Sequence, residues 1–391
     1  MGKWEMVKLG EVTTVVSGST PKTSVNEYWN GEHNWVTPAE LNDSVIMVYE
    51  TERKITNKAI EDYNLTPLPL GTVLLTSRAP IGKVAIAGVE MYCNQGFKNI
   101  ICSDKIHNKY LFWFLKGRTD FLNSLGRGAT FKEISKSIVE QIQVPLPPIE
   151  TQKQIAKTLD TVAELLAMRK QQLAELDNLI KSTFYDMFGD LEHNSCGWEE
   201  RPLKDIAEIV SGITKGRKLR ETETKVIPYL RVANVQDGYL DLTDIKYIEV
   251  ADSEIEKYRL FKGDLLMTEG GDPDKLGRCA IWNEEIPFCI HQNHIFRVRL
   301  DQKRVLPEYA CFLIQSPYGK KYFLKAAKQT TGIASINSKQ ISNFPLLIPN
   351  IKLQTKFAEI VTKFEEPKAM VQKAIDETQY LFDSLMSEYF D

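Results

Sequence analysis

Two long stretches of the chain place apolar residues at alternating steps of four and three positions. In the first stretch, from 155 to 187, eight of ten such positions are apolar. In the second, from 357 to 389, eight of ten are again apolar. A 3.5-residue repeat sustained over about five heptads is typical of a coiled-coil seam. The pattern predicts two helices of about 40 residues, each roughly 60 Å long.

The two apolar stripes most simply bury against each other, because a stripe left alone would face water. An antiparallel pairing follows if the two halves of the chain are related by a pseudo-twofold axis. The alternative is that each helix packs only against its own domain. The residues predicted to line the seam are Ile155, Leu159, Val162, Leu166, Leu173, Leu176 and Ile180 in the first helix, and Phe357, Val361, Phe364, Val371, Ile375, Phe382 and Leu385 in the second.

Short β-rich runs precede each long helix and predict a folded domain there. They are TVLLTS, KVAIAG and KNIIC in the first half, and DLLMTE, CAIW and IFRVRL in the second. Short helices are expected at NKYLFWFLKG and PEYACFLIQS. We therefore expect an α+β fold, with two similar mixed domains separated by two long helices that form an antiparallel coiled coil. The expected segments are a first domain at 1–149, a central spacer helix at 150–190, a second domain at 195–350 and a C-terminal spacer helix at 351–391.

The two halves repeat the same short motifs in the same order, at a spacing near 200 residues. The matched pairs are VSG at 16–18 and 210–212, GTVLLT at 71–76 and GDLLMT at 263–268, IGKVA at 81–85 and LGRCA at 276–280, NQ at 94–95 and HQ at 291–292, and PPIETQKQIA at 147–156 and IPNIKLQTKFA at 348–358. Each match is weak alone, but the shared order predicts a duplicated domain plus helix.

Composition narrows the class of protein without indicating a partner. The 391-residue chain is 43% hydrophobic and 26% charged, which is ordinary for a globular protein, and its net charge is −3. It contains no run of 18 apolar residues and its first residues lack the apolar core of a secretory signal, so we expect a cytoplasmic protein that spans no membrane. The six cysteines form no CxxC pair and are expected to be reduced.

Several of these segments together resemble a known family, the DNA-specificity subunits of type I restriction-modification enzymes. The segments similar to the first half of such subunits are SGSTPKTSVNEYWNGEHNWVTPAEL (17–41), LTSRAPIGKVAIAG (75–88), NQGF (94–97) and PLPPIETQKQIAKTLD (145–160). Those similar to the second half are LRVANVQDGYLDLTDIKYI (230–248) and GDLLMTEGGDPDKLGRCAIW (263–282). The resemblance covers essentially the whole chain.

The resemblance implies that the chain itself performs no chemistry. Each domain would be a target-recognition head that reads one half of a split DNA sequence, and the helices would set the gap between the halves. It also implies partners: double-stranded DNA, two copies of an adenine methyltransferase subunit docked on the helices, and separate restriction-translocase subunits. S-adenosylmethionine, ATP and Mg²⁺ would be bound by those partners, with no cofactor in this chain. Because the heads differ in sequence, the target should be asymmetric.

The candidate DNA contacts are polar or cationic residues in loops beside the predicted strands. Small residues allow close approach to phosphates, arginine suits guanine or phosphate, and amide side chains suit adenine. The same residues could instead form ordinary turns, caps or a solvated face. The candidates are Gly18, Ser19, Thr20, Lys22, Arg78, Lys83, Asn94, Gln95, Lys215, Arg217, Lys218, Arg231, Asn234, Arg278, His291, Gln292 and Asn293.

Two other functions stay open on the sequence alone. A stand-alone metal-dependent nuclease could use Asp274, Asp301 and Lys303, although this pattern is permissive and its counterpart in the first half lacks the acid. A coiled-coil scaffold whose heads bind protein would explain the helices only. The chain has no GxxxxGK[ST] loop and no NPPY motif, and we expect no metal site, because the cysteine and histidines at 289–294 lack an evident fourth ligand.

Overall fold

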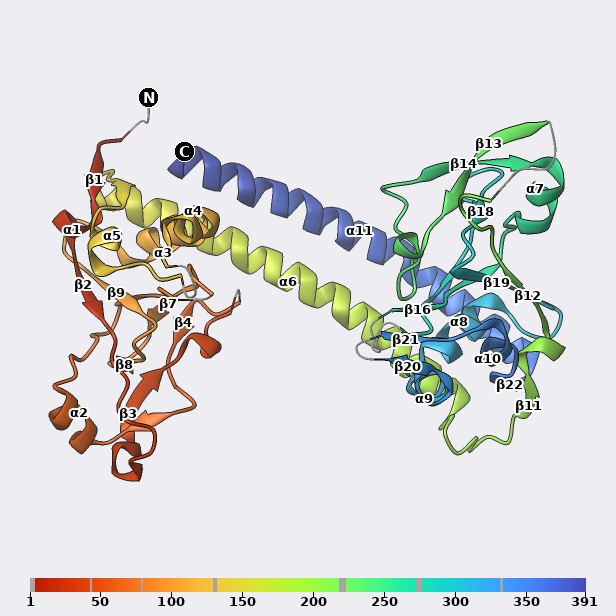
Figure 1. Ribbon diagram of the computed structural model, residues 1–391, viewed down its shortest axis with the longest axis horizontal. Coiled ribbons are helices and arrows are strands. Elements are labelled where there is room, and N and C mark those ends of the chain that lie inside the picture. The colour runs from red at the N-terminus through yellow and green to blue at the C-terminus, as the bar shows by residue number, and fades with distance from the viewer. Residues whose placement is uncertain are drawn as a thin grey trace. The chain divides into compact units, whose positions relative to one another are not determined.

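The structure is a computed structural model that describes residues 4–42, 44–78, 80–128, 132–217, 223–271, 276–330 and 333–391. The chain divides into two compact units, the first formed by 1–171 with 372–391 and the second by 172–371. Each unit contains one head and parts of both long helices (Figure 1). Because the units divide the long helices, the four consecutive segments expected from the sequence stay a prediction.

The first head is built on a five-stranded sheet with the order β2-β9-β6-β7-β4. Its strands are β2 Thr13–Ser17, β4 Met47–Val48, β6 Val73–Leu75, β7 Val84–Ala87 and β9 Lys98–Cys102. The smaller β5-β3-β8 sheet and β1-β10 pair comprise β1 Met6–Lys8, β3 Trp29–Val36, β5 Lys54–Ile55, β8 Tyr92–Cys93 and β10 Gln143–Pro145. The short helices are α1 Leu9–Val12, α2 Asn57–Tyr63, α3 Asn108–Lys116, α4 Thr119–Leu125 and α5 Lys136–Glu140.

The second head is built on a four-stranded sheet with the order β12-β19-β15-β17. Its strands are β12 Ala207–Ser211, β15 Leu265–Thr268, β17 Cys279–Ile281 and β19 Ile295–Leu300. The smaller sheets comprise β11 Glu199–Pro202, β13 Thr224–Leu230, β14 Lys246–Ala251, β16 Gly270–Gly271, β18 Ile290–His291, β20 Lys328–Thr330, β21 Ile333–Ser335 and β22 Pro345–Ile348. The short helices are α7 Asp252–Tyr258, α8 Pro307–Gln315, α9 Pro317–Ala326 and α10 Ser338–Ser342.

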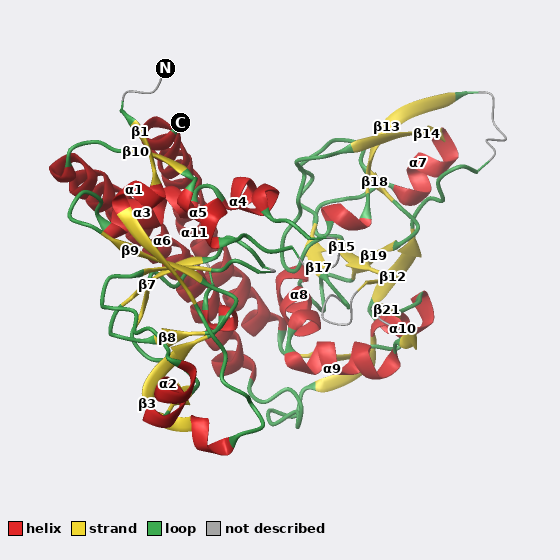
Figure 2. Ribbon diagram, turned by 60° about the vertical axis from the view of Figure 1, so that its left-hand side comes forward, coloured by secondary structure: helices red, strands yellow, loops and turns green. Residues whose placement is uncertain are grey.

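The strand orders of the two heads correspond, which confirms the duplication and the α+β class. The run β2-β9-β6-β7 in the first head matches β12-β19-β15-β17 in the second, with every pairing antiparallel. The smaller sheets match as well, since β3 and β13 each have one antiparallel and one parallel neighbour. Figure 2 shows these strands in yellow, with the short helices beside them.

The two long helices are α6, Ile149–Phe188, and α11, Ile351–Phe390, and each has the predicted 40 residues. Both begin just after prolines, which restrict the residue before them to extended backbone. In the first unit, the first part of α6 lies beside the last part of α11; in the second, the last part of α6 lies beside the first part of α11 (Figure 1). The pairing is therefore antiparallel, as predicted.

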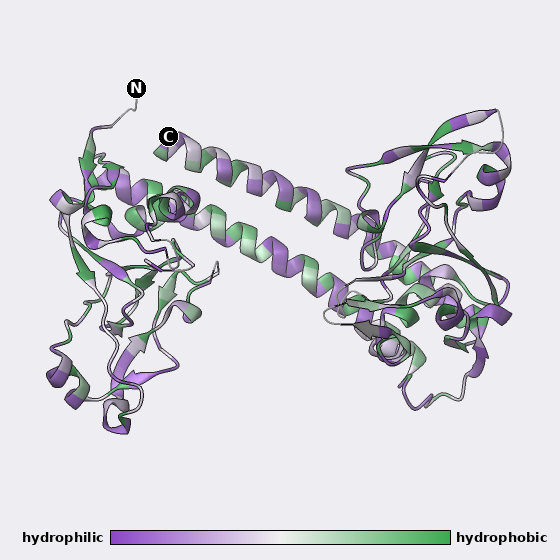
Figure 3. Cartoon of the chain, in the orientation of Figure 1, coloured by the Kyte–Doolittle hydropathy of each residue, from purple (hydrophilic) through white to green (hydrophobic). Residues whose placement is uncertain are grey.

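The heptad pattern correctly identifies the buried face of both helices. All fourteen predicted seam residues, seven in each helix, are buried or half-buried. Apolar and polar residues alternate along both helices, as the green and purple bands in Figure 3 show. Among the helices of the described residues, none combines the length and apolar character that a bilayer crossing requires.

Polar residues interrupt the apolar steps of the seam, and they bind one another. Arg169 of α6 donates through Nη1 to the carbonyl oxygen of Ala374, at 2.5 Å, and to the hydroxyl of Thr378, both in α11. Lys368 of α11 forms an ion pair with Asp177 of α6 at 2.7 Å. Polar seam residues favour one register, because any other alignment of the helices would leave them unpaired against apolar neighbours.

The end of a long helix completes the core of each head. In the first unit, Phe390 at the end of α11 is 7% exposed, and its ring lies 5.3 Å from that of Tyr110 in α3. In the second, Phe184 and Phe188 near the end of α6 lie 5.8 and 4.7 Å from the ring of Tyr309 in α8. Each head therefore depends on a helix end for part of its buried apolar surface.

A buried glutamine joins each head to the start of a long helix. Gln152 accepts a hydrogen bond from the backbone N–H of His107 at 2.8 Å and donates to the carbonyl oxygens of Lys105 and Pro147, at 3.0 and 2.8 Å. Gln354 makes the same three bonds in the second unit, where its partners are Leu306, Arg304 and Pro349. Both glutamines are 0% exposed, so their bonds replace water as the partner of these main-chain groups.

We expect Gln152→Ala to lower the free energy of unfolding of the first unit by about 1–3 kcal/mol, because buried main-chain groups lose their partner. Gln354→Ala should have the same effect on the second unit. Urea denaturation of the full chain measures both. The matched control is Gln154→Ala, an exposed glutamine in the same helix, for which we expect a change within about 0.5 kcal/mol. Equal effects of Gln152→Ala and Gln154→Ala would contradict this role.

Candidate nucleic-acid interface

Three loops of the first head meet beyond the ends of its strands. They are residues 18–20, 77–78 and 94–96, and together with Glu133 we call them the first loop cluster. The backbone N–H of Ser77 donates to the carbonyl oxygen of Gly96 at 2.7 Å, and that of Gln95 donates to the hydroxyl of Thr20 at 3.2 Å. Six of the predicted DNA contacts, Gly18, Ser19, Thr20, Arg78, Asn94 and Gln95, are therefore brought together.

The second head has an equivalent second loop cluster, formed by residues 212–214, 269–270 and 292–294 with Ser335. The backbone N–H of Glu269 donates to the carbonyl oxygen of His294 at 2.9 Å, as Ser77 does to Gly96 in the first head. Gly270 pairs with Ser335, as Arg78 pairs with Glu133. The same backbone framework therefore supports both clusters.

A glycine allows the first loop of each cluster to approach its neighbour. A Cβ on Gly18 would lie 1.9 Å from the carbonyl oxygen of Asn94, and one on Gly212 would lie 2.1 Å from that of His291. No side chain fits at such distances, so both positions require glycine. These close approaches are to the chain's own backbone, and the predicted approach of Gly18 to phosphate stays a prediction.

The hydrogen bonds correct the predicted alignment of the two heads by one residue. The backbone N–H of Asn94 donates to Val36 at 3.0 Å, and the corresponding bond in the second head runs from Gln292 to Leu230 at 2.9 Å. Asn94 therefore corresponds to Gln292, and not to His291 as the matched NQ and HQ strings suggested. The sequence match was wrong because it aligned Gln95 with Gln292, two identical residues that occupy neighbouring and not equivalent backbone positions.

His291 lies inside the second head and does not reach the interface. It is 0% exposed, and within the described residues neither ring nitrogen has a hydrogen-bond partner. Burial, with the nearby guanidinium of Arg297, lowers the pKa of His291 to about 3, so the ring is neutral. Cys93 occupies the corresponding position in the first head. We therefore leave His291 out of the interface that we propose, and keep its half-buried neighbours Gln292 and Asn293.

The side chains at the tips of the two clusters differ in charge. In the first cluster, Arg78 donates through Nε to Glu133 at 3.0 Å, and Lys98 binds the other carboxylate oxygen at 3.0 Å. In the second, His294 Nδ1 lies 2.5 Å from a carboxylate oxygen of Glu269. A shared framework with different tips is what two readers of unlike DNA sequences require.

Glu133 and Lys98 were not predicted from the sequence. Glu133 lies 55 residues beyond Arg78, and no local motif marks it. Partial burial raises the pKa of Glu133, but the hydrogen bonds from Lys98 and Arg78 outweigh it and lower the pKa overall. The carboxylate is therefore charged at neutral pH.

Lys83 and Arg278, the cation shared by the two heads, each bind their own head. Lys83 Nζ donates to the carbonyl oxygen of Leu41 at 2.7 Å. Arg278 Nη1 donates to the side chain of Gln236 at 2.8 Å. Both bonds hold a neighbouring loop in place, and the predicted contact with the DNA backbone stays a prediction.

Three other candidates in the second head have internal partners. Arg217 binds Glu254 through Nε and Nη2, at 2.6 and 2.5 Å, and these bonds lower the pKa of Glu254. Arg231 pairs with Asp244 at 2.8 Å. Asn234 is buried and accepts from the backbone N–H of Arg231 at 2.8 Å, which makes it a turn cap. Their predicted DNA contacts stay untested.

The remaining candidate cations are at the surface or beyond the described residues. Lys22, just past the first loop cluster, is exposed, and so is Lys215, just past the second. Lys218 lies outside the residues that the structure describes. Lys22 and Lys215 stay candidates for contact with phosphates.

Of the three residues of the nuclease alternative, the structure describes Asp301 and Lys303. Asp301 accepts from the backbone N–H of Lys303 at 3.1 Å in the turn after β19. Asp274 lies outside the described residues. Within those residues, His, Cys, Asp and Glu side chains form no group of three that could hold a metal ion. Asp301 shapes a turn, and no observation favours a nuclease.

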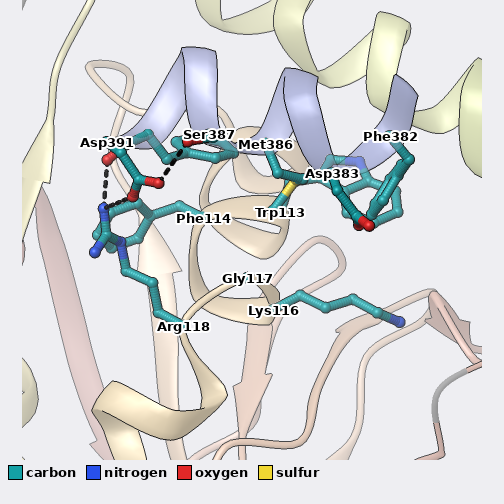
Figure 4. A pocket seen from close by; sticks show the side chains of 11 residues that line it. Trp113, Phe114, Lys116, Gly117, Arg118, Phe382, Asp383, Met386, Ser387 and Asp391 are labelled. Atoms are coloured by element: carbon teal, nitrogen blue, oxygen red, sulfur yellow. Dashed lines mark hydrogen bonds and ion pairs between the residues drawn. The ribbon is translucent and has the colours of Figure 1, made fainter. Parts of the chain in front are cut away.

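A cavity of about 350 Å³ lies in the first unit between α3 and the end of α11 (Figure 4). Trp113, Phe382 and Met386 line it, and Arg118 binds Asp391 at 3.3 Å at one end. In the second unit the place of Met386 is taken by Phe184, since each lies 32 residues after the buried glutamine of its helix.

A family model described as the type I restriction modification DNA specificity domain matches residues 1–178 and again residues 196–378. Each match spans one head and most of the helix that follows it. The chain is also 30% identical to the type I restriction enzyme MjaIX specificity subunit of Methanocaldococcus jannaschii, over 98% of this chain and 91% of that one. It is 24% identical to the EcoKI specificity subunit of Escherichia coli K12, over 99% of this chain and 88% of that one.

Solved structures support the same fold. The S subunit of the type I restriction-modification system from M. genitalium superimposes with a TM-score of 0.58, at 16% identity, over 100% of this chain and 96% of that one. A chain from a structure that describes the assembly and conformational transition of a type I R-M system gives a TM-score of 0.55, at 16% identity, over 99% of this chain and 97% of that one.

Lowering the pH from about 7 to about 5 should destabilise the second unit, because His291 gains a proton only on unfolding. Its pKa in the folded chain, about 3, lies below the unfolded value of about 6.5. The stabilisation is therefore complete above about pH 6.5 and is lost below it, at up to about 1.4 kcal/mol per pH unit.

Urea denaturation at several pH values measures this slope. The comparison variant is His291→Cys, which introduces the residue found at the corresponding position of the first head. We expect a shallower pH dependence for His291→Cys, even if its stability at neutral pH is lower. An unchanged slope would show that another group causes the effect.

Proposed function

Because the chain belongs to the type I restriction modification DNA specificity family, whose model matches both of its halves, we propose that each head reads a different half of a bipartite DNA target. The chain is the non-catalytic DNA-recognition component of a type I restriction-modification system. The heads differ at the tips of their loop clusters, so the two half-sites should differ in sequence.

The observation that carries this proposal is the shared backbone framework of the two loop clusters. Equivalent hydrogen bonds hold the loops of both heads, whereas the residues at the tips change from Arg78 and Glu133 to Gly270 and Ser335. Contacts to the DNA phosphates position a protein on a duplex, and side chains at base edges read its sequence. A shared protein framework would present both heads to the duplex in the same way, while different side chains at the tips would read different bases. The two heads share their main-chain hydrogen bonds and differ in the side chains at the loop tips, as two domains that read different sequences would.

The paired helices would act as the spacer between the two half-sites. A coiled coil of 40-residue helices is stiff because its seam is packed along both partners and its register is fixed by Arg169 and Thr378. Half-sites about one turn of the duplex apart would lie on the same face of the DNA. The target should therefore have a gap of fixed length.

The relatives are named as specificity subunits of restriction enzymes, and we extend this to partners of the present chain. The long helices would dock two adenine methyltransferase subunits, and restriction-translocase subunits would complete the assembly. S-adenosylmethionine, ATP and Mg²⁺ would then bind to those partners. With double-stranded DNA as its target, the complex would act in the cytoplasm.

The test is to co-express the full chain with the adenine methyltransferase of the same restriction-modification locus and to map methylated adenines by sequencing. We expect one motif with two unlike halves and a gap of constant length. The control is the methyltransferase without this chain, which should not methylate that motif. A palindromic motif, or methylation that is the same without the chain, would contradict the proposal.

Lengthening both helices by one heptad should lengthen the gap without changing either half-site. Seven residues inserted after Gln171 and seven after Val371 keep the seam in phase and add about 10 Å, or about three base pairs. The methylation map should show the longer gap, or no methylation if the enlarged spacing no longer suits the duplex. A changed base within a half-site would contradict the role of the helices as a spacer.

A further inference from the structure

Arg78 lies at the tip of the first loop cluster, where Glu133 binds its side chain. Its side chain is 45% exposed, and the residue lies three positions beyond the end of β6. Among the described residues, its hydrogen bond runs from Nε to Glu133 at 3.0 Å and does not use Nη1 or Nη2. The outer edge of the guanidinium thus keeps donors for a ligand.

Glu133 is itself fixed from two directions. Its backbone exchanges two hydrogen bonds with Arg127, at 3.0 and 2.9 Å. Its second carboxylate oxygen binds Lys98, whose side chain is only 9% exposed. Lys98 already balances the charge of Glu133, so Arg78 is not needed to neutralise it. The arrangement holds the arginine in one orientation and lowers the entropy that it would lose on binding.

The second head keeps the backbone of this site and replaces all three side chains. Gly270, Ser335 and Phe296 stand at the positions of Arg78, Glu133 and Lys98, in the same strand pairings. A contact with the DNA backbone would serve both heads equally well. A set of side chains that is present in one head and absent as a whole from the other instead suits the reading of sequence.

Among the bases, guanine presents two acceptors, O6 and N7, on its major-groove edge, and the two outer donors of a guanidinium match them. Adenine offers a donor beside its acceptor at that edge, and thymine offers a methyl group, so neither accepts a forked pair of bonds.

We propose that Arg78, oriented by Glu133 and Lys98, reads a guanine in the half-site bound by the first head. Arg78 makes the contact, and Glu133 and Lys98 are positioning residues. This inference rests on the proposed function and adds the base, the residue that reads it and the pair that orients it.

The experiment uses the full chain with its methyltransferase and selects bound duplexes from a library of random sequence. We expect the wild type to require guanine at one position of one half-site. Arg78→Ala should reduce that preference roughly tenfold to a hundredfold and leave the other half-site unchanged. Glu133→Gln should weaken the same preference while binding to unrelated DNA stays the same or rises, because one negative charge is removed.

The matched control is Lys136→Ala, which removes another surface ion pair of the same head, with Glu140 at 3.7 Å. It should alter neither half-site. The inference is overturned if Arg78→Ala keeps the guanine preference and only weakens binding to every sequence with a smaller salt dependence, which is the behaviour of a phosphate contact. It is also overturned if the base that relaxes is not guanine, or if Glu133→Gln lowers stability without any change in preference.

The wild-type selection separates this inference from the proposed function. A wild type that selects no bipartite sequence would overturn the proposed function and this inference with it. A wild type that selects two unlike half-sites, of which Arg78→Ala changes neither, would overturn the assignment of Arg78 alone.

Discussion

The two hydrophobic cores depend on one constraint: a helix end must lie in each of them. Phe390 reaches the core of the first unit from α11, and Phe184 with Phe188 reach that of the second from α6. In the first unit, the pairing of Arg169 with Thr378 favours one register of the two helices, and this register also sets where the ring of Phe390 lies. A shift of the seam would withdraw apolar side chains from the heads and expose the surface that they cover.

Much of this fold could be predicted from the chain, because its main signals are local. The 3.5-residue repeat identifies the buried face of both helices, and the repeated motifs identify two heads of one kind. The pairing of Arg169 with Thr378 could not be predicted, because it joins residues about two hundred positions apart. The role of Gln152 and Gln354 was visible in principle, as they stand at the same place in both copies of the motif at the start of the long helices.

The candidate site was predicted in part, and the missing part has a physical reason. The loop at 18–20 follows β2 and the loop at 94–96 precedes β9, and these two strands pair antiparallel, so the two loops meet. Glu133 enters the same cluster through a bridge to Arg78 that no sequence spacing encodes. His291 was predicted as a DNA contact because it lies in a polar, loop-like string, but the structure buries it. Only the backbone hydrogen bonds show that it corresponds to Cys93 and not to Asn94.

The closure of the first core by residues 372–391 has a consequence for biosynthesis. A ribosome releases the chain from its N-terminus, so the first head is made long before the segment that completes its core. The second unit, contained in 172–371, has all its residues earlier. The half of the molecule that is translated first is therefore the last that can finish folding, and until then its unfinished core is exposed to chaperones and proteases.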